Sequence, residues 1–374
     1  MKHLIFFLIF PLSVSSQDAD VWKRIDHFAE NTSPENFTDV NEFGNFINQH
    51  YSTANEKSRF IYTWIAIHIS YDTDCFLGRN DNKQDAESVF TTKRAVCEGY
   101  ANLFDKLCWL TGVTSMKVEG LGARQAHSQH AWNAIKVNGT WYLIDVTWAS
   151  GGLDSSNQFE HAFSDYYFLT QPEQFIHEHL PYDPMWQLLR SPVTKKDFFN
   201  KKFAVISTIG SFSFEDTIAN YLALDSVRRE YDFYRRSFAF DPFNSLVKEG
   251  YTYSLMLVAN SYIHQGDDRF NDYFKIKKLA FDSAQIFAGK REQVTLLLDS
   301  CSQYYYEANH IFQNLDAPSQ PENLIALKEN RMVIAERYRN LAEEKNFVKY
   351  YFSASPEKRA SVLHSYLKIL NFKF

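Results

Sequence analysis

Three residues of types that catalyse acyl transfer are separated along this chain: Cys97, His130 and Asp145. A cysteine thiolate attacks carbonyl carbons, and an adjacent imidazole takes the thiol proton and later protonates the leaving group. A carboxylate hydrogen-bonded to that imidazole fixes its tautomer and orientation. Each residue alone is weak evidence of catalysis, because lone cysteines and histidines are commonly buried structural groups. Together they suggest a Cys-His-Asp catalytic triad.

The residues from 97 to 111 have the pattern of a helix that begins at Cys97 and stops at Gly112. The free backbone N–H groups and the positive end of the dipole at a helix start favour a thiolate there. We expect Gly99 to keep the approach to the sulfur open. The sequence therefore places the nucleophile at the N-terminus of a packed helix.

A β-hairpin is predicted over residues 130–148, where Asn138-Gly139 forms a two-residue turn signal. A two-residue turn at this place pairs residues whose numbers sum to 277, so Trp132 faces Asp145. His130 and Asp145 then lie diagonally on one face of the hairpin, within reach of a hydrogen bond. A slip of one residue would separate them onto opposite faces.

Other interpretations of the reactive residues stay open at this stage. Cys97, His127, His130 and Asp145 could bind a metal ion, although the two histidines precede a strand. Cys75 and Cys108 could form a disulfide in an oxidising compartment. The run His177-Glu178-His179 lies among prolines and is interpreted as surface. No cofactor motif is found, so we expect neither a bound cofactor nor a resident metal.

Composition limits the classes of function. The 374 residues include 33 Phe, 22 Tyr and 7 Trp but only 13 Gly, which indicates a folded chain with large cores. A formal charge of −6 gives no global field that would attract nucleic acid. The length allows two domains.

The first 16 residues resemble a secretory signal peptide. Leu4–Leu12 is an apolar run too short to span a bilayer, and Val14 and Ser16 occupy the −3 and −1 positions before Gln17. We therefore expect cleavage after Ser16 and a secreted or periplasmic protein. No later stretch is apolar enough to predict a membrane span.

The C-terminal half, residues 196–374, is predicted to be all helical. Long helical patterns cover 214–237, 242–264, 268–288, 290–314, 322–346 and 356–370. Gly266 is expected just past the end of one helix. Aromatic residues crowd these helices, and we expect some of them to contact the catalytic domain or a protein partner.

The blocks VCEGYANLFDKLCWLTGV at 96–113 and HAWNAIKVNGTWYLIDVTWASG at 130–151 resemble the transglutaminase-like superfamily of papain-like cysteine enzymes. With IYTWIAIHISYD at 61–72 and the segment 166–189, they look most like the kyphoscoliosis peptidase group. The resemblance covers roughly residues 40–195 and implies an α+β fold, with a nucleophile helix packed on an antiparallel sheet. Carried over residue by residue, it implies that Cys97, His130 and Asp145 are catalytic.

The domain organisation follows: a signal peptide at 1–16, a transglutaminase-like domain at 17–195 with core motifs at 56–151, and a helical domain at 196–374. We expect an exported thiol enzyme that acts on amide bonds of a protein or peptide, as a peptidase, glutaminase or transglutaminase. Tyr71 and Trp64 are candidates for the second oxyanion donor, although core packing suits Trp64 better. The alternative is a non-catalytic binding module whose helical domain engages a partner.

Overall fold

The protein, seen in a computed structural model, divides into two compact units, Met1–Ile218 and Ala219–Phe374. The structure describes residues 16–123, 128–203, 211–279 and 287–371. The division lies beyond the predicted domain boundary at residue 195. Contacts explain this, since the Phe203 ring packs on that of His177 and Arg190 pairs with Glu215 at 2.8 Å. These contacts hold the segment after residue 195 on the first unit.

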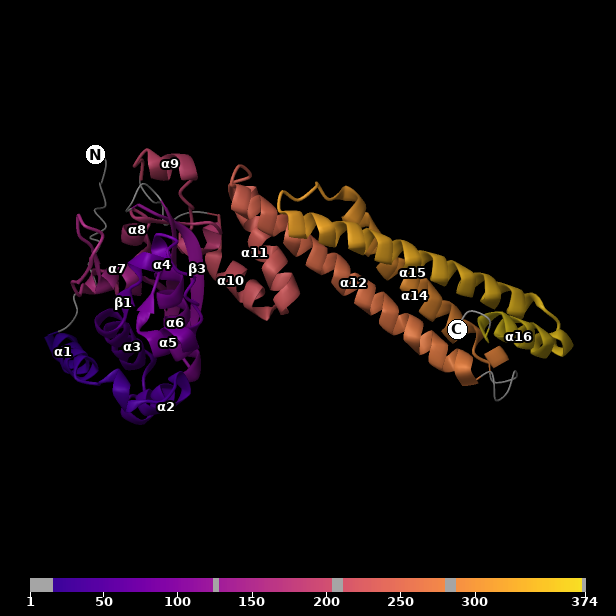
Figure 1. The fold of residues 1–374 in the computed structure, drawn as a ribbon, viewed down its shortest axis with the longest axis horizontal. Coiled ribbons are helices and arrows are strands. Elements are labelled where there is room, and N and C mark those ends of the chain that lie inside the picture. Colours follow the sequence, from indigo (N-terminus) through magenta and orange to yellow (C-terminus); the bar gives the residue numbers. More distant parts are fainter. Residues whose placement is uncertain (1–15, 124–127, 204–210, 280–286, 372–374) are drawn as a thin grey trace, which may run out of the picture. The chain divides into compact units, whose positions relative to one another are not determined.

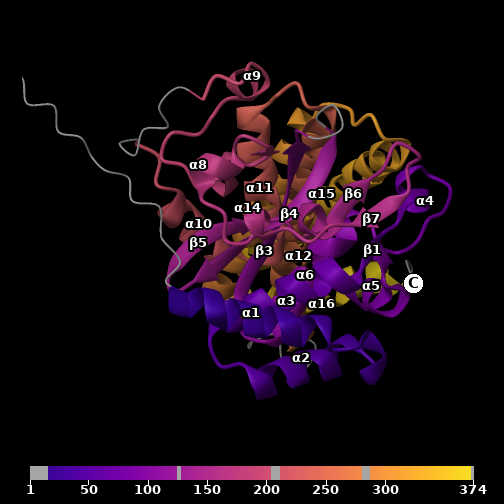
Figure 2. The ribbon, with the colours of Figure 1, turned by 90° about the vertical axis from the view of Figure 1, so that its left-hand side faces the viewer.

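The first unit combines helices with short strands (Figures 1 and 2). Its α-helices are α1 Ser16–Glu30, α2 Val40–His50, α3 Ala54–His68, α4 Thr73–Phe76, α5 Ala86–Thr92, α6 Cys97–Leu110, α7 Val146–Ser150, α8 Pro172–Phe175 and α9 Lys195–Phe199, and the division between the units falls within α10 Phe214–Ala223. Its strands are β1 Ser70–Tyr71, β2 Arg94–Ala95, β3 Thr114–Gly122, β4 Gln129–Val137, β5 Thr140–Ile144, β6 Gly151–Leu153, β7 Phe159–His161 and β8 His179–Pro181.

The central sheet has the strand order β5-β4-β3-β8, and all its pairings are antiparallel. The hairpin register is as predicted, since Val137 pairs with Thr140 and Asn133 with Ile144. Asn138 and Gly139 both have positive φ, which the two-residue turn requires. One detail was wrong: β5 ends at Ile144, so Asp145 does not lie within a strand.

Helix α6, which begins with Cys97, packs across β3 and β4, and α3 packs against α6 (Figure 2). The α6 face made by Ala101, Phe104 and Cys108 is buried, as its apolar character predicts. Trp64 of α3 is fully buried, and its indole N–H donates to the Thr32 carbonyl. The α+β architecture expected for the N-terminal half is thus confirmed.

The second unit is helical in its described part, and α12, α14 and α15 run alongside one another (Figure 1). Its helices are α11 Ser226–Phe240, α12 Ser245–Leu279, α14 Arg291–Asn314, α15 Pro321–Ser353 and α16 Pro356–Asn371.

Two helix boundaries differ from the prediction. The pattern at 214–237 is broken, because the Asp225 side chain accepts from the Arg228 N–H and starts a new helix. Gly266 lies inside α12 and does not end a helix. A Cβ at this glycine would lie 2.4 Å from the Tyr305 ring, so the residue permits close packing of α12 on α14.

The predicted signal peptide lies almost entirely outside the described residues, which begin with Ser16 at the start of α1. Cleavage after Ser16 therefore stays a prediction. Among the described helices, none combines the length and apolar character that crossing a membrane requires.

Candidate active site

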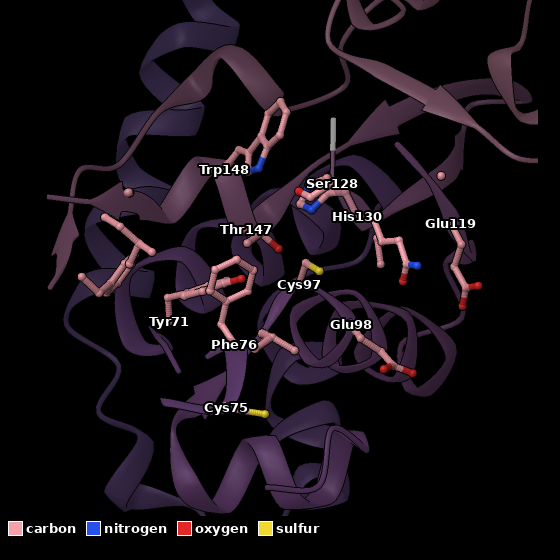
Figure 3. Close-up of a pocket in the computed structure, with 18 of the residues that line it drawn as sticks. Tyr71, Cys75, Phe76, Cys97, Glu98, Glu119, Ser128, His130, Thr147 and Trp148 are labelled. Carbon is pink, nitrogen blue, oxygen red and sulfur yellow. The ribbon is translucent and has the colours of Figure 1, made fainter. Parts of the chain in front are cut away.

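Cys97 is the first residue of α6, as the sequence predicts. The N-cap residue Val96 makes no side-chain cap, so capping does not occupy the first-turn N–H groups beside the sulfur. Cys97 is partly exposed and lines a cavity of about 890 Å³ (Figure 3). The sulfur therefore sits where a helix start meets open space.

The residue before Cys97, Val96, is held in place by Gln84. Its Oε1 atom accepts from the Val96 N–H at 2.9 Å, and its Nε2 atom donates to the Asn82 carbonyl at 2.8 Å. A Cβ on Gly99 would lie 2.5 Å from the same Oε1 atom. Gly99 therefore makes room for Gln84 behind the helix; the expectation that it opens the approach to the sulfur was wrong.

His130 on β4 and Asp145 are joined by a hydrogen bond of 2.7 Å between Nε2 and Oδ2. Asp145 is the N-cap of α7, and its Oδ1 atom accepts from the Trp148 N–H at 2.9 Å. The predicted contact is thus present, but the position of the carboxylate comes from a helix start and not from a strand. With Nε2 bonded to Asp145, Nδ1 is the ring nitrogen left for the Cys97 thiol, and both residues line the same cavity.

Electrostatics favour an ion pair between the two residues. Burial acts to lower the pKa of His130, but the charge of Asp145, its hydrogen bond and the hydrogen bond to Cys97 prevail and raise the pKa to about 9. Burial acts to raise the pKa of Asp145, but the His130 charge and hydrogen bonds from two histidines hold it well below its usual range. The imidazole is therefore charged at neutral pH.

A second histidine contacts the same carboxylate, and the sequence reasoning missed it. His179 Nε2 lies 2.8 Å from Asp145 Oδ2, and its side chain is fully buried. The interpretation of residues 177–179 as surface holds for the exposed His177 but was wrong for His179. No local signal could have found it, since all three residues of the strand His179–Pro181 are buried and show no alternation.

The alternative uses of the reactive residues are resolved in part. Cys75 and Cys108 are free thiols, so they form no disulfide. His127, one of the four candidate metal ligands, lies outside the described residues. His130, Asp145 and His179 have potential ligand atoms within 4.8 Å of one another. Because both imidazoles already bond to the carboxylate, we assign the cluster to a hydrogen-bonded network.

The cavity around Cys97 has two kinds of wall. Figure 3 shows Tyr71, Phe76 and Trp148 to one side of the sulfur and Glu98 and Glu119 to the other. The Tyr71 hydroxyl points toward the sulfur, whereas the Trp64 indole faces the Thr32 carbonyl in the core. Of the two candidate oxyanion donors, Tyr71 therefore lies at the site and Trp64 does not.

The site combines a cysteine at a helix start with an imidazole on the adjacent sheet. Known proteins have sequences similar to the part of the chain that forms it. Residues 42–146 match the family model of the transglutaminase-like superfamily, so the first unit contains a transglutaminase-like domain. The chain is 32% identical over 202 residues to the human kyphoscoliosis peptidase, a match that covers 51% of this chain and 30% of that protein.

More distant relatives match a similar part of the chain. Hillarin of Drosophila melanogaster is 26% identical over 177 residues, which cover 41% of this chain and 21% of hillarin. The chain thus spans about a third or less of the curated relatives it matches. A crystal structure of a TGase aligns with a TM-score of 0.26 and 17% identity over 43% of this chain and 40% of that one.

Proposed function

We propose that this protein is a thiol-dependent acyl-transfer enzyme that acts on amide bonds of a protein or peptide. The observation that carries the proposal is the hydrogen bond between His130 and Asp145 at a cavity that Cys97 and His130 line together. Membership of the matched domain in a superfamily that includes cysteine peptidases and transglutaminases supports it.

In the proposed reaction, the Cys97 sulfur attacks the amide carbonyl and His130 holds the thiol proton. The tetrahedral oxyanion accepts a hydrogen bond from the Cys97 backbone N–H, which helix geometry leaves unpaired. We assign the second donor to the Tyr71 hydroxyl, which points to the same place. His130 then protonates the departing nitrogen, the C–N bond breaks and a thioester remains on Cys97.

Water or a primary amine then takes the acyl group from the thioester. The two acceptors are distinguished by the products of a glutamine-containing peptide, incubated with and without a primary amine and analysed by mass spectrometry. Hydrolysis adds the elements of water or converts Gln to Glu, whereas transamidation adds the amine with loss of ammonia.

The test of the proposed nucleophile is iodoacetamide labelling of the folded protein at neutral pH, read by peptide mapping. We expect rapid labelling of Cys97 in the wild type and no labelling at that position in Cys97→Ala. In Cys75→Ala, Cys97 should be labelled as rapidly as in the wild type. Cys75 is the matched control, because it lines the same cavity but burial raises the pKa of its thiol. Equal, slow labelling of Cys97 and Cys75 would contradict the proposal.

Two expectations about the surroundings of the chain also stand as proposals. Export is supported by the apolar run Leu4–Leu12, and N-terminal sequencing of the mature protein should begin at Gln17.

A protein partner of the helical unit is supported by exposed side chains such as Phe243 and Met332, which are 93% and 73% exposed. Crosslinking in the host from positions next to these two residues should capture one protein. That crosslinked product should disappear when Phe243 and Met332 are both replaced by serine.

A further inference from the structure

We propose that His179 is a positioning residue of the active site, which holds the Asp145 carboxylate in the orientation that His130 needs. This inference rests on the proposed function. The geometry behind it is a single oxygen, Asp145 Oδ2, which accepts from His130 Nε2 at 2.7 Å and from His179 Nε2 at 2.8 Å. His130, Asp145 and His179 thus form one hydrogen-bonded network, and His130 lines the cavity that Cys97 also lines.

The His179 ring is held by aromatic side chains. It stacks on Phe175 with ring centroids 3.8 Å apart, and the Trp148 ring lies 4.2 Å away. Packed between these rings, the imidazole cannot turn without displacing them. The Nε2–H group is therefore aimed permanently at Asp145.

Packing alone does not explain a histidine here. Its Nδ1 atom is buried without a hydrogen-bond partner among the described residues, which is unfavourable for a polar atom. An apolar ring would suit the aromatic surroundings better. Among the described residues, the one hydrogen-bond partner of the His179 side chain is Asp145, so that contact is the reason for a histidine at this position.

The hydrogen bond from His179 stabilises the charge of the buried Asp145 carboxylate. Asp145 is fully buried, and its carboxylate stays ionised through donors from three elements: His130, His179 and the Trp148 N–H. Burial and the His130 charge lower the pKa of His179, with Asp145 and the neighbouring Glu178 opposing them, so His179 donates as a neutral ring.

His179 comes from the edge strand β8, where it pairs with Gly122 of β3. It lies beyond the 42–146 segment that matches the superfamily model. The edge strand therefore contributes to the site as well as closing the sheet, and the functional unit extends to residue 179 at least.

The experiment compares three variants by the rate of Cys97 alkylation with iodoacetamide between pH 4 and pH 9. The amide nitrogen of His179→Gln can occupy the place of Nε2, whereas that of His179→Asn occupies the place of Nδ1 and falls short of Asp145. We expect His179→Asn and His179→Phe to react about tenfold more slowly near pH 6, since a hydrogen bond to a charge is lost. Their ascending pH limb should move about one unit upward.

His179→Gln should stay within about threefold of the wild type, with an unchanged pH limb. The same changes are then made in Asp145→Asn, where a residue that acts through the carboxylate has no further effect. The positioning role would be overturned if both His179→Asn and His179→Phe kept the wild-type alkylation rate and pH profile. It would also be overturned if these changes slowed alkylation equally in the Asp145→Asn background. An inert Cys97 in the wild type would instead overturn the proposed function.

Discussion

Both units of this protein contain a carboxylate that is buried among several donors, Asp145 in the first and Glu344 in the second, and the two clusters differ in what they adjoin. Asp145 in the first unit accepts from two imidazoles and a backbone N–H. Glu344 in the helical unit accepts from the Tyr273 hydroxyl and the Lys277 ammonium, both at 2.6 Å, and from the Tyr366 hydroxyl at 2.9 Å. By burial and hydrogen bonding alone, both would qualify as active sites.

Access separates them. The Lys277 ammonium lies 4.2 Å from the Tyr366 ring centroid and 4.6 Å from that of Phe347, and Lys277 is 2% exposed. The Asp145 network instead includes His130, which lines a cavity together with Cys97. A buried ion pair therefore indicates chemistry only when it leads to a reactive atom that a substrate can reach; otherwise it joins helices.

The largest effect is expected from Asp145→Asn. The amide oxygen can still cap α7, but the charge that raises the pKa of His130 is gone. We expect acyl transfer to a reporter peptide to fall about 10⁴-fold, as in other triads that lose this charge. Glu344→Gln is the matched control in the helical unit and should leave the rate unchanged. A loss below about tenfold in Asp145→Asn would remove the distinction between the clusters.

In the helical unit the same kind of change should affect stability instead. Glu344→Leu leaves the Lys277 ammonium buried without its partner, and we expect the unfolding free energy to fall by about 3–5 kcal/mol. The double variant Lys277→Met with Glu344→Leu should recover most of it. Denaturant titration measures both, and Cys97 alkylation in the native state should be equal in all three proteins. Slower alkylation would show that the cluster acts on the site.

The stability of the first unit should depend on pH through the His130–Asp145 pair. Because the folded pKa of His130 is about 9, above its usual value near 6.5, its contribution is complete below pH 6.5 and is lost as pH rises through 9. The loss is on the order of 3 kcal/mol. Denaturant titrations at pH 6 and pH 10 measure it, and Asp145→Asn should remove most of the difference. An equal difference in that variant would place its source elsewhere.

Much of the site follows from the sequence, because local rules fix it. The turn at Asn138-Gly139 sets the register that carries His130, and the helix pattern places Cys97 at its start. The closeness of the His130 and Asp145 side chains was therefore predictable. That Asp145 caps a short helix was not, since α7 has only five residues and follows the strand directly.

His179 could not be located by such rules. It reaches Asp145 across 34 positions of the chain, through an edge strand of three residues whose place is set by pairing with β3. Gly266 shows the same limit in the helical unit, because its role depends on Tyr305, far along the chain. Local patterns predict elements, whereas the contacts between elements decide what an individual residue does.

A smaller effect on catalysis is expected from Tyr71→Phe, which removes only the hydroxyl that points to the Cys97 sulfur. If this group stabilises the oxyanion, kcat should fall about 10²-fold while KM changes little. Tyr182→Phe, at another wall of the same cavity, serves as the control. A change in KM with kcat unaltered would assign Tyr71 to substrate binding instead.

The smallest effect completes the comparison, because Tyr366→Phe removes one donor from Glu344 as His179→Asn removes one from Asp145. We expect Tyr366→Phe to lower the unfolding free energy by about 2 kcal/mol, the typical value for a hydrogen bond to a charged group. Native-state alkylation of Cys97 should not change, since Glu344 leads to no reactive atom. His179→Asn should show the reverse pattern, with a clear change in reactivity. If both variants altered only stability, His179 and Tyr366 would be equivalent structural donors, and the difference between the two clusters would end at Cys97, His130 and Asp145.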